Sequence, residues 1–129
     1  MFYIGIDLGT SAVKLLLMDE NGQVLHTVQK EYPLSFPKTG WSEQNPEDWW
    51  SQTRAGIRDL MEGFDSTQGD GLSFSGQMHG LVLLDERDQV IRPAILWNDG
   101  RTAEITLRLL ARRKDTVIDE AFFEQRVRD

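Results

Sequence analysis

The sequence predicts an α/β fold in which a three-stranded antiparallel meander is followed by parallel strands with crossover helices. Three observations support this prediction. Apolar residues alternate with period two over residues 2–8, and two more strand-like runs follow, separated by an Asn-Gly pair. A helical apolar pattern over residues 46–64 then separates this meander from another strand at residues 72–75. A helix between two strands indicates a crossover into a parallel pair.

Composition limits the classes of function. The chain has 129 residues, which suffices for one domain with a core but not for two of ordinary size. Its net charge of −7 argues against nucleic acid and anionic membranes, because both need positive fields. The absence of cysteine excludes disulfides and thiolate metal sites, and two histidines exclude most histidine zinc sites. No membrane-length apolar run or signal peptide is present, so we expect a cytoplasmic protein.

The opening strand at residues 2–8 has two unlike faces. One face carries apolar side chains, namely those of Phe2, Ile4, Ile6 and Leu8. The other face is nearly bare beyond Tyr3 except for the carboxylate of Asp7, which lies between two glycines. A strand face of this kind favours close approach of another group to the backbone.

The turn after this strand has the chemistry of a phosphate site. Gly9, Thr10 and Ser11 can aim N–H groups and two hydroxyls at an anion, and Lys14 can add positive charge. With Asp7 to hold a cation, they predict a nucleotide phosphate site. The alternative is ordinary turn chemistry, in which aspartate caps its own backbone and glycine supplies a positive φ. The motif alone leaves both interpretations open, and it is neither a Walker loop nor a dinucleotide fingerprint.

The next elements are predicted from pattern and turn chemistry. Residues 13–18 form a dense apolar run typical of a central strand, and residues 23–31 predict a third, more exposed strand. His26 is expected on the surface of that strand, without a function. Residues 32–45 contain Pro33, Pro37 and Gly40 and predict a long loop.

A helix is predicted from Asn45 to about Phe64. Asn45 suits the N-cap, Pro46 suits the first helical position, and two acids follow at the positive helix end. Residues at helical spacing predict its buried stripe: Trp49, Trp50, Thr53, Ile57, Leu60, Met61 and Phe64. Residues 65–71 predict a polar turn before the parallel strand.

Two further groups of polar residues lie where strands are expected to end. Gly76 and Gly80 enclose Gln77, Met78 and His79, a mixture of donors, acceptors and soft apolar surface. In open α/β sheets ligands bind beyond the carboxyl ends of strands, which favours a small-molecule site here. The alternative is that the histidine has a structural role only.

The second group is Trp97, Asn98 and Asp99. The indole ring could cover the apolar face of a sugar while the amide and carboxylate take its hydroxyls. Equally, Trp97 could belong to the core while Asn98 or Asp99 caps a helix predicted over residues 102–113. Beyond residue 114 the pattern weakens, and Phe122-Phe123 could anchor a short final helix.

Four motifs together carry a family resemblance. They are Tyr-Ile-Gly-Ile-Asp-Leu-Gly-Thr-Ser (3–11), Trp-Ser-Glu-Gln-Asn-Pro-Glu-Asp-Trp-Trp (41–50), Ser-Gly-Gln-Met-His-Gly (75–80) and Pro-Ala-Ile-Leu-Trp-Asn-Asp-Gly-Arg (93–101). In this order they resemble the beginning of the xylulokinases, a branch of the FGGY carbohydrate kinases. The resemblance implies the ribonuclease H-like fold of the actin-like ATPases. The last two motifs favour xylulokinase over the glycerol, gluconate and ribulose kinases.

The resemblance also implies roles for single residues. Asp7 would hold the Mg²⁺ of ATP through water, and Gly9, Thr10, Ser11 and Lys14 would bind phosphate. The sugar would contact Met78 and His79, with Trp97 and Asp99 lining the same pocket. The implied reaction is ATP-dependent phosphorylation of D-xylulose to D-xylulose 5-phosphate. Positioning and charge neutralisation supply most of the catalysis in phosphoryl transfer.

Two departures from the family qualify this implication. Members of the family are several times longer, and their general base lies beyond the matching region, so we expect residues 1–129 to form part of an N-terminal domain that is inactive alone. The resemblance covers about residues 1–105, and the tail from 112 to 129 does not follow the pattern. Two alternative functions stay open: another FGGY kinase, for gluconate, ribulose or glycerol, and a non-catalytic binding or assembly fragment. Surfaces exposed by truncation could also form a homodimer.

Overall fold

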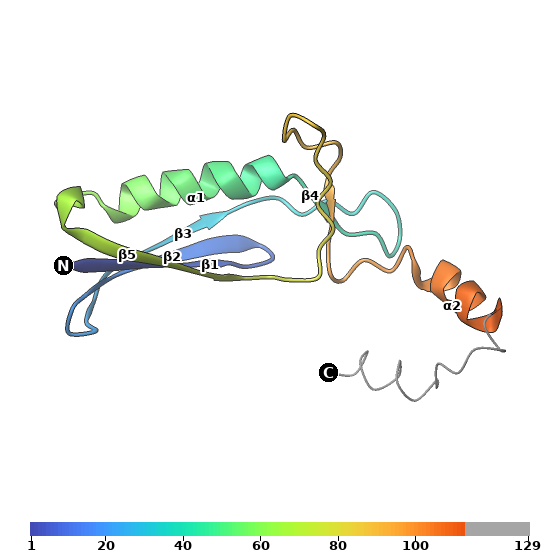
Figure 1. Ribbon diagram of the computed structural model, residues 1–129, viewed down its shortest axis with the longest axis horizontal. Helices are drawn as coiled ribbons and strands as arrows, with labels where there is room; N and C mark the ends of the chain where they lie inside the picture. The colour runs from blue at the N-terminus through green and yellow to red at the C-terminus, as the bar shows by residue number, and fades with distance from the viewer. Residues whose placement is uncertain (113–129) are drawn as a thin grey trace. The chain divides into compact units, whose positions relative to one another are not determined.

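The computed structural model describes residues 1–112 and confirms the predicted meander. Strands β1 (Phe2–Leu8), β2 (Ala12–Asp19) and β3 (Val24–Glu31) pair in antiparallel succession (Figure 1). The Asn-Gly turn between β2 and β3 places Gly22 at a φ of 82°, a conformation that suits glycine. The Asp19 carboxylate accepts hydrogen bonds from the N–H groups of Asn21 and Gln23, which close the turn.

The predicted crossover is also present. Helix α1 (Pro46–Leu60) follows the meander, and strand β5 (Gly69–Gly76) then pairs parallel with β1. A short 3₁₀ turn, η1 (Ser66–Gln68), connects them. Within the described residues the sheet has the order β3-β2-β1-β5, and Figure 1 shows α1 lying across one face of it. This is the expected ribonuclease H-like arrangement.

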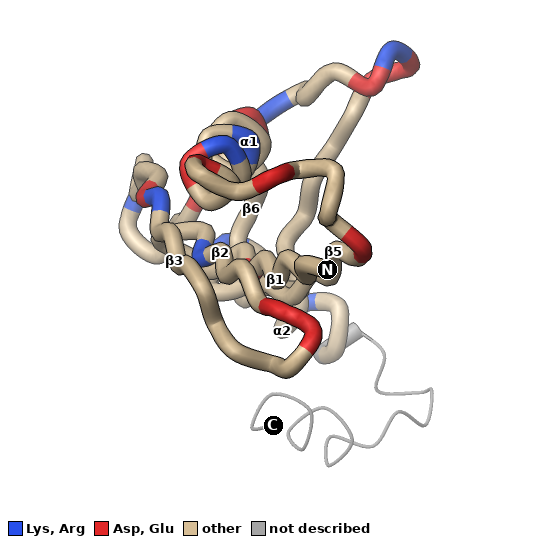
Figure 2. Tube along the Cα trace, turned by 90° about the vertical axis from the view of Figure 1, so that its left-hand side faces the viewer, with Lys and Arg blue, Asp and Glu red and all other residues tan. Residues whose placement is uncertain are grey.

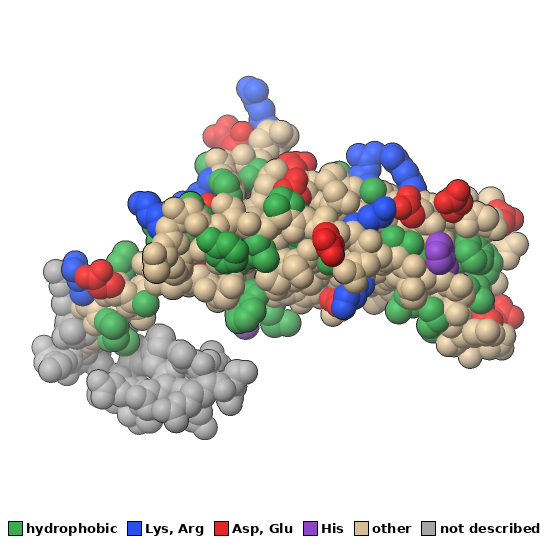
Figure 3. Space-filling view, turned by 180° about the vertical axis from the view of Figure 1, so that it is seen from behind, with side chains coloured by type: hydrophobic (Ala, Val, Ile, Leu, Met, Phe, Trp, Pro, Cys, Tyr) green, Lys and Arg blue, Asp and Glu red, His purple; other side chains and the backbone are tan. Residues whose placement is uncertain are grey.

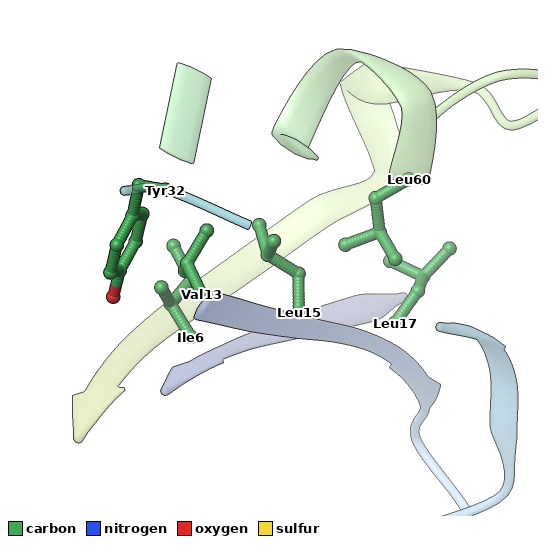
Figure 4. Close-up of a cluster of buried hydrophobic side chains, with 6 residues drawn as sticks. All are labelled: Ile6, Val13, Leu15, Leu17, Tyr32 and Leu60. Carbon is green, nitrogen blue, oxygen red and sulfur yellow. The ribbon is translucent and has the colours of Figure 1, made fainter. Parts of the chain in front are cut away.

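The core lies between α1 and that face of the sheet. Its buried side chains come from β1, β2, α1 and the residue after β3 (Figure 4): Ile6, Val13, Leu15, Leu17, Tyr32 and Leu60. Full burial of one such aliphatic side chain contributes about 1.5–3 kcal/mol. His26 belongs to this side too, because its Nδ1 lies 3.0 Å from the Leu60 carbonyl oxygen and its ring stacks on Phe64. The histidine predicted at the surface is therefore half-buried and bonded to α1.

Two details of α1 differ from the prediction. The helix ends at Leu60 rather than near Phe64, because the chain turns over residues 61–64 and Gly63 takes a φ of 83°. Trp50 is 60% exposed and does not belong to the buried stripe. Consecutive helical residues lie about 100° apart, so Trp49 packs on the core while Trp50 lies beside Arg54. Figure 2 shows acidic and basic residues interspersed along α1.

Two very short strands were not predicted. β4 (Glu43–Gln44) lies in the expected long loop and pairs antiparallel with β6 (Ala94–Ile95). The chain between β5 and β6 forms a hairpin with a bridge between Leu84 and Val90, and Leu81 bridges to Ile95. The β4–β6 pairing brings the predicted loop next to the segment that precedes Trp97.

The described residues divide into two compact units. The first comprises residues 1–99, and the second begins at Gly100 and contains helix α2 (Ala103–Arg112), close to the predicted helix over 102–113. The short helix predicted at Phe122-Phe123 lies outside the described residues. No helix within residues 1–112 is long and apolar enough to cross a membrane.

Candidate functional site

The turn after β1 is held by its carbonyl groups. The N–H of Gly9 donates to the Ala12 carbonyl at 3.0 Å and closes the turn. The hydroxyl of Tyr32 donates to the Gly9 carbonyl, and Nε2 of Gln44 donates to the Thr10 carbonyl at 2.7 Å. The N–H of Tyr32 donates to the Ser11 carbonyl at 3.2 Å. Three consecutive carbonyls are thus bonded to the body of the protein.

This anchoring determines where the N–H groups point. In a planar trans peptide the N–H points opposite to the carbonyl of the preceding residue. The N–H of Thr10 therefore points away from Tyr32, and that of Ser11 points away from Gln44. In the part of the chain that the structure describes, neither N–H has a hydrogen-bonding partner. Two adjacent N–H groups directed outward form an arrangement that can bind an anion.

Asp7 and Lys14 lie on the face of the sheet opposite α1. They are paired across β1 and β2, and Asp7 lies opposite Ser75 on β5. Both side chains are exposed. They line an open cavity of about 690 Å³ over this face, in which Asp7 is the acid among the lining residues. A phosphate can be bound by a cation, which Lys14 supplies. Magnesium can be bound by a carboxylate, which Asp7 supplies.

Tyr32 connects the core to the turn. Burial of its ring, together with the negative charge of Asp7, raises the pKa of Tyr32 to about 12. The hydroxyl therefore stays protonated at neutral pH and remains a donor to the Gly9 carbonyl.

The Gln-Met-His segment leaves the sheet where β5 ends. A Cβ at Gly76 would lie 2.8 Å from the Leu8 carbonyl oxygen, so only glycine fits without moving the backbone. The N–H of Gln77 donates to that same oxygen at 2.8 Å. Beyond it Met78 is 67% exposed, and His79 has a φ of 63°, which is unusual for histidine.

Trp97 and Asp99 occupy different positions. Trp97 is 58% exposed and its Nε1 donates to the Thr10 hydroxyl at 3.2 Å, so the interpretation as a core residue was wrong. The Asp99 carboxylate accepts the N–H of Ser42 at 2.7 Å, which ties the segment after β6 to the residue before β4.

A second cavity, of about 370 Å³, brings the two predicted sites together. Its lining comes from the turn after β1, the end of β5 and the segment after β6: Gly9, Thr10, Gly76, Gln77, Met78, His79 and Trp97. Ser11 and Asp99 are not among the residues that line it, and Asp7 and Lys14 line the larger cavity instead. The turn thus borders the cavity of about 370 Å³, which is lined by apolar groups and the imidazole of His79. It lies next to the cavity of about 690 Å³, which contains the charged groups of Asp7 and Lys14.

Two residues at this site were not singled out from the sequence. Gln44 and Tyr32 hold the turn, yet both lie in or beside a segment predicted to be loop. Gln44 lies within the second family motif, which is the one sequence signal that could have indicated it.

The family profile of the FGGY family of carbohydrate kinases, N-terminal domain, matches residues 2–123. The chain belongs to this family. Among FGGY kinases, the xylulose kinase of Bacillus subtilis is 50% identical over 120 residues, which are 92% of this chain and 24% of the relative. The chain therefore spans about a quarter of the length of the curated FGGY relatives that it matches.

Solved FGGY kinases agree with this assignment. The crystal structure of a xyloylose kinase from Brucella ovis matches this chain with a TM-score of 0.80 and 42% sequence identity. The match covers 88% of this chain and 24% of the kinase chain. The crystal structure of the gluconate kinase from Lactobacillus acidophilus matches with a TM-score of 0.79 and 32% sequence identity. This match covers 87% of this chain and 23% of the gluconate kinase chain. The predicted actin-like ATPase fold is confirmed.

Proposed function

We propose that this chain forms one wall of the active site in a kinase that transfers phosphate from ATP to D-xylulose, giving D-xylulose 5-phosphate. The observation that carries the proposal is the cavity of about 370 Å³. It is lined both by Gly9 and Thr10 of the phosphate turn and by Met78 and His79 of the sugar-side motif. Phosphoryl transfer requires donor and acceptor to meet in one place, and this cavity adjoins both groups.

The nucleotide would lie against the turn and the neighbouring strands. The outward N–H groups of Thr10 and Ser11, with the ammonium of Lys14, fit the oxygens of a polyphosphate. Asp7 fits magnesium, because this ion is held by one or two carboxylates together with waters and substrate phosphates. When bound, magnesium would neutralise charge on the phosphates. The donor set of this chain is thus suited to Mg²⁺ and ATP.

The sugar would lie in the cavity against Met78, His79 and Trp97. The indole and thioether give apolar contact, and the imidazole can donate to or accept from a hydroxyl. Trp97 already shares a hydrogen bond with Thr10, which places the sugar-side ring next to the turn. We also propose a sugar contact for Asp99, whose carboxylate in addition accepts a hydrogen bond from the N–H of Ser42.

The proposed reaction needs more than these residues. The terminal hydroxyl of the sugar attacks the γ-phosphorus, the bond to the bridging oxygen breaks, and the hydroxyl proton passes to a general base. In the family this base is an aspartate further along the chain than the segment matched here. We therefore propose that residues 1–129 alone do not catalyse the reaction, and that the complete enzyme works in the cytoplasm, where ATP is supplied.

A kinase assay tests the proposal. The full translation product that carries this sequence is offered D-xylulose, D-ribulose, D-gluconate and glycerol with ATP and Mg²⁺. We expect the highest kcat/KM with D-xylulose, and a preference for any of the other three would contradict the sugar assignment. Residues 1–129 alone should be inactive. As a positive control, the same segment replaces its counterpart in the Bacillus subtilis enzyme, where it should support activity that Asp7→Ala removes.

Gluconate is the second candidate. The gluconate kinase structure resembles this chain almost as well as the xyloylose kinase structure does, with TM-scores of 0.79 and 0.80. Backbone likeness therefore does not separate the two sugars. The identities of 50% and 42% to the Bacillus subtilis and Brucella ovis kinases, against 32% to the gluconate kinase, favour xylulose, and the assay decides between them.

A further inference from the structure

Gln44 lies at the junction of the two proposed binding regions. Its side chain is 2% exposed. Nε2 donates to the carbonyls of Thr10 at 2.7 Å and Pro33 at 3.3 Å, while Oε1 accepts from Nε1 of Trp49 at 3.0 Å and Nε2 of Gln77 at 3.2 Å. An amide side chain has two N–H donors and two acceptor positions, so the hydrogen-bonding capacity of Gln44 is fully used.

The partners leave one orientation for this amide. An indole N–H can only donate, so Trp49 must face Oε1. Backbone carbonyls can only accept, so Thr10 and Pro33 must face the NH₂ group. Reversing the amide would break all of these bonds, and β4 together with α1 therefore fixes the direction in which the amide points.

The fixed amide in turn orients two groups of the site. On one side it holds the Thr10 carbonyl and so directs the N–H of Ser11 outward. On the other side it accepts from Nε2 of Gln77, the first residue of the Gln-Met-His segment. Oε1 of Gln77 is buried and has no partner within residues 1–112, so the contact with Gln44 orients that amide.

We infer that Gln44 is a positioning residue that couples the phosphate turn to the sugar-side segment. The inference rests on the proposed function, which assigns the ATP phosphates to the turn and the sugar to the Gln-Met-His segment. A change in the position of Gln77, such as a bound sugar would impose, alters the bond to Oε1. The amide is rigid and planar, so the change reaches Nε2 and hence the Thr10–Ser11 peptide.

The coupling can be measured on the full 129-residue chain without any ligand. Gln77→Leu removes one partner of Gln44 at the sugar side while leaving its backbone bond to Leu8 in place. We expect it to change the ¹⁵N–¹H chemical shifts of Thr10 and Ser11. In a Gln44→Met background most of this change in the shifts should be lost, because the side chain that connects Gln77 to the Thr10 carbonyl is absent.

A matched control separates coupling from general loosening of the structure. Trp49→Phe also removes one partner of Gln44, but that partner belongs to α1 rather than to the sugar side. In a Trp49→Phe background, the response of Thr10 and Ser11 to Gln77→Leu should be preserved. A response that is equal with and without Gln44, or no response in the parent chain, overturns the inference.

A third measurement does not require a Gln44 variant, should Gln44→Met fail to fold. The side-chain NH₂ of Gln44 itself is followed in the parent chain and in Gln77→Leu, where its signals should shift and exchange faster with solvent. Unchanged signals overturn the inference. Since neither ATP nor sugar is present, this result is independent of the kinase assay, and either proposal can fail while the other stands.

Discussion

His79 holds a backbone conformation that histidine rarely adopts, and its substitutions should separate backbone strain from side-chain function. A non-glycine residue at a φ of 63° costs roughly 1–2 kcal/mol, which glycine does not incur. We expect His79→Gly to leave the free energy of unfolding unchanged or to raise it, as measured by urea denaturation. In the chimeric kinase the same variant should raise the KM for the sugar, because it removes the imidazole.

His79→Ala is the control for this prediction. It removes the same imidazole but keeps a Cβ at the unfavourable φ, so it should be less stable than His79→Gly. A glycine variant that is less stable than the alanine variant would show that relief of the unfavourable φ does not offset the larger backbone entropy that glycine loses on folding.

Tyr32 gives a prediction about pH. Its pKa in the folded chain is about 12, raised by burial and by Asp7, against 10.0 for an ordinary tyrosine. The folded state thus keeps its proton more tightly than the unfolded state. The stabilisation from this difference is complete below pH 10 and is lost as the pH rises towards 12.

The measurement is urea denaturation between pH 9 and pH 12 for the parent chain and Tyr32→Phe. The parent should lose stability more steeply in this range, because Tyr32→Phe has no hydroxyl to ionise. Tyr32→Phe should start from lower stability at neutral pH, because the Gly9 carbonyl loses its donor, at a cost of about 1 kcal/mol. Parallel curves for the two chains would contradict this account.

For single residues, the sequence predicted which residues line the site better than it predicted their contacts. Thr10, His79 and Trp97 were predicted because strand ends collect ligand-binding groups, and they do line one cavity. The bond between Asp99 and Ser42 joins residues far apart in the chain, so no local pattern could have predicted it. The same holds for Gln44, whose partners come from the turn, the loop, α1 and the end of β5.

At the scale of single elements, α1 packs tightly against β2 at Gly56. A Cβ at this position would lie 2.5 Å from Cδ1 of Leu15, which is 2% exposed and has little room to move. Gly56→Ala should therefore lower the free energy of unfolding by about 1–3 kcal/mol through overpacking. The gain in helix propensity of about 1 kcal/mol offsets part of this cost, so the net loss should be about 2 kcal/mol or less. Thermal or urea denaturation measures the difference.

A double-mutant cycle identifies the contact responsible. Leu15→Ala removes the methyl groups that meet the new Cβ, so Gly56→Ala should cost much less in that background or become stabilising. Equal costs in both backgrounds would place the strain elsewhere along the helix.

Elements with strong local signals were predicted well, and those set by tertiary pairing were not. The alternation in β1, the Asn-Gly turn and the Asn45 cap are local, and each lies where it was expected. The two-residue strands β4 and β6 arise from pairing with segments far apart in the chain, and they are too short to show a periodicity. Periodicity likewise could not decide between Trp49 and Trp50, which are neighbours at the edge of the apolar stripe.

At the scale of the whole molecule, apolar side chains remain at the surface of the sheet. Figure 3 shows apolar side chains in several separate groups on the face seen from behind. Strand β5 lies at an edge of the described sheet and carries Phe74 and Leu72, which are 71% and 47% exposed. Its one charged residue is Asp70, so little opposes pairing with another chain.

We therefore expect the 129-residue chain to self-associate in a concentration-dependent manner in sedimentation velocity experiments. Phe74→Lys should shift the population towards monomer, because it adds charge and removes apolar area at the β5 edge. Val24→Lys on β3, where the side chain is 52% exposed, is the matched control and should have a smaller effect. A monomer at every concentration, or equal effects of both variants, would contradict the prediction.

The global topology was the part of the fold that the sequence predicted best. A meander, one helix and one further strand leave few arrangements, because a helical crossover returns the chain parallel to its starting strand. The resemblance of four short motifs to one family supplied the rest. The positions of those motifs at turns and strand ends explain why they gather around one cavity.

The parallel pairing of β1 with β5 also sets an order of events during translation. The meander β1-β2-β3 is complete once Glu31 has been made, but β5 ends only at Gly76. At a synthesis rate of about 5–20 residues per second, one edge of β1 stays open for several seconds while α1 is made. The turn after β1 can therefore form before the cavity, whose lining is complete only after residues 76–97 have left the ribosome.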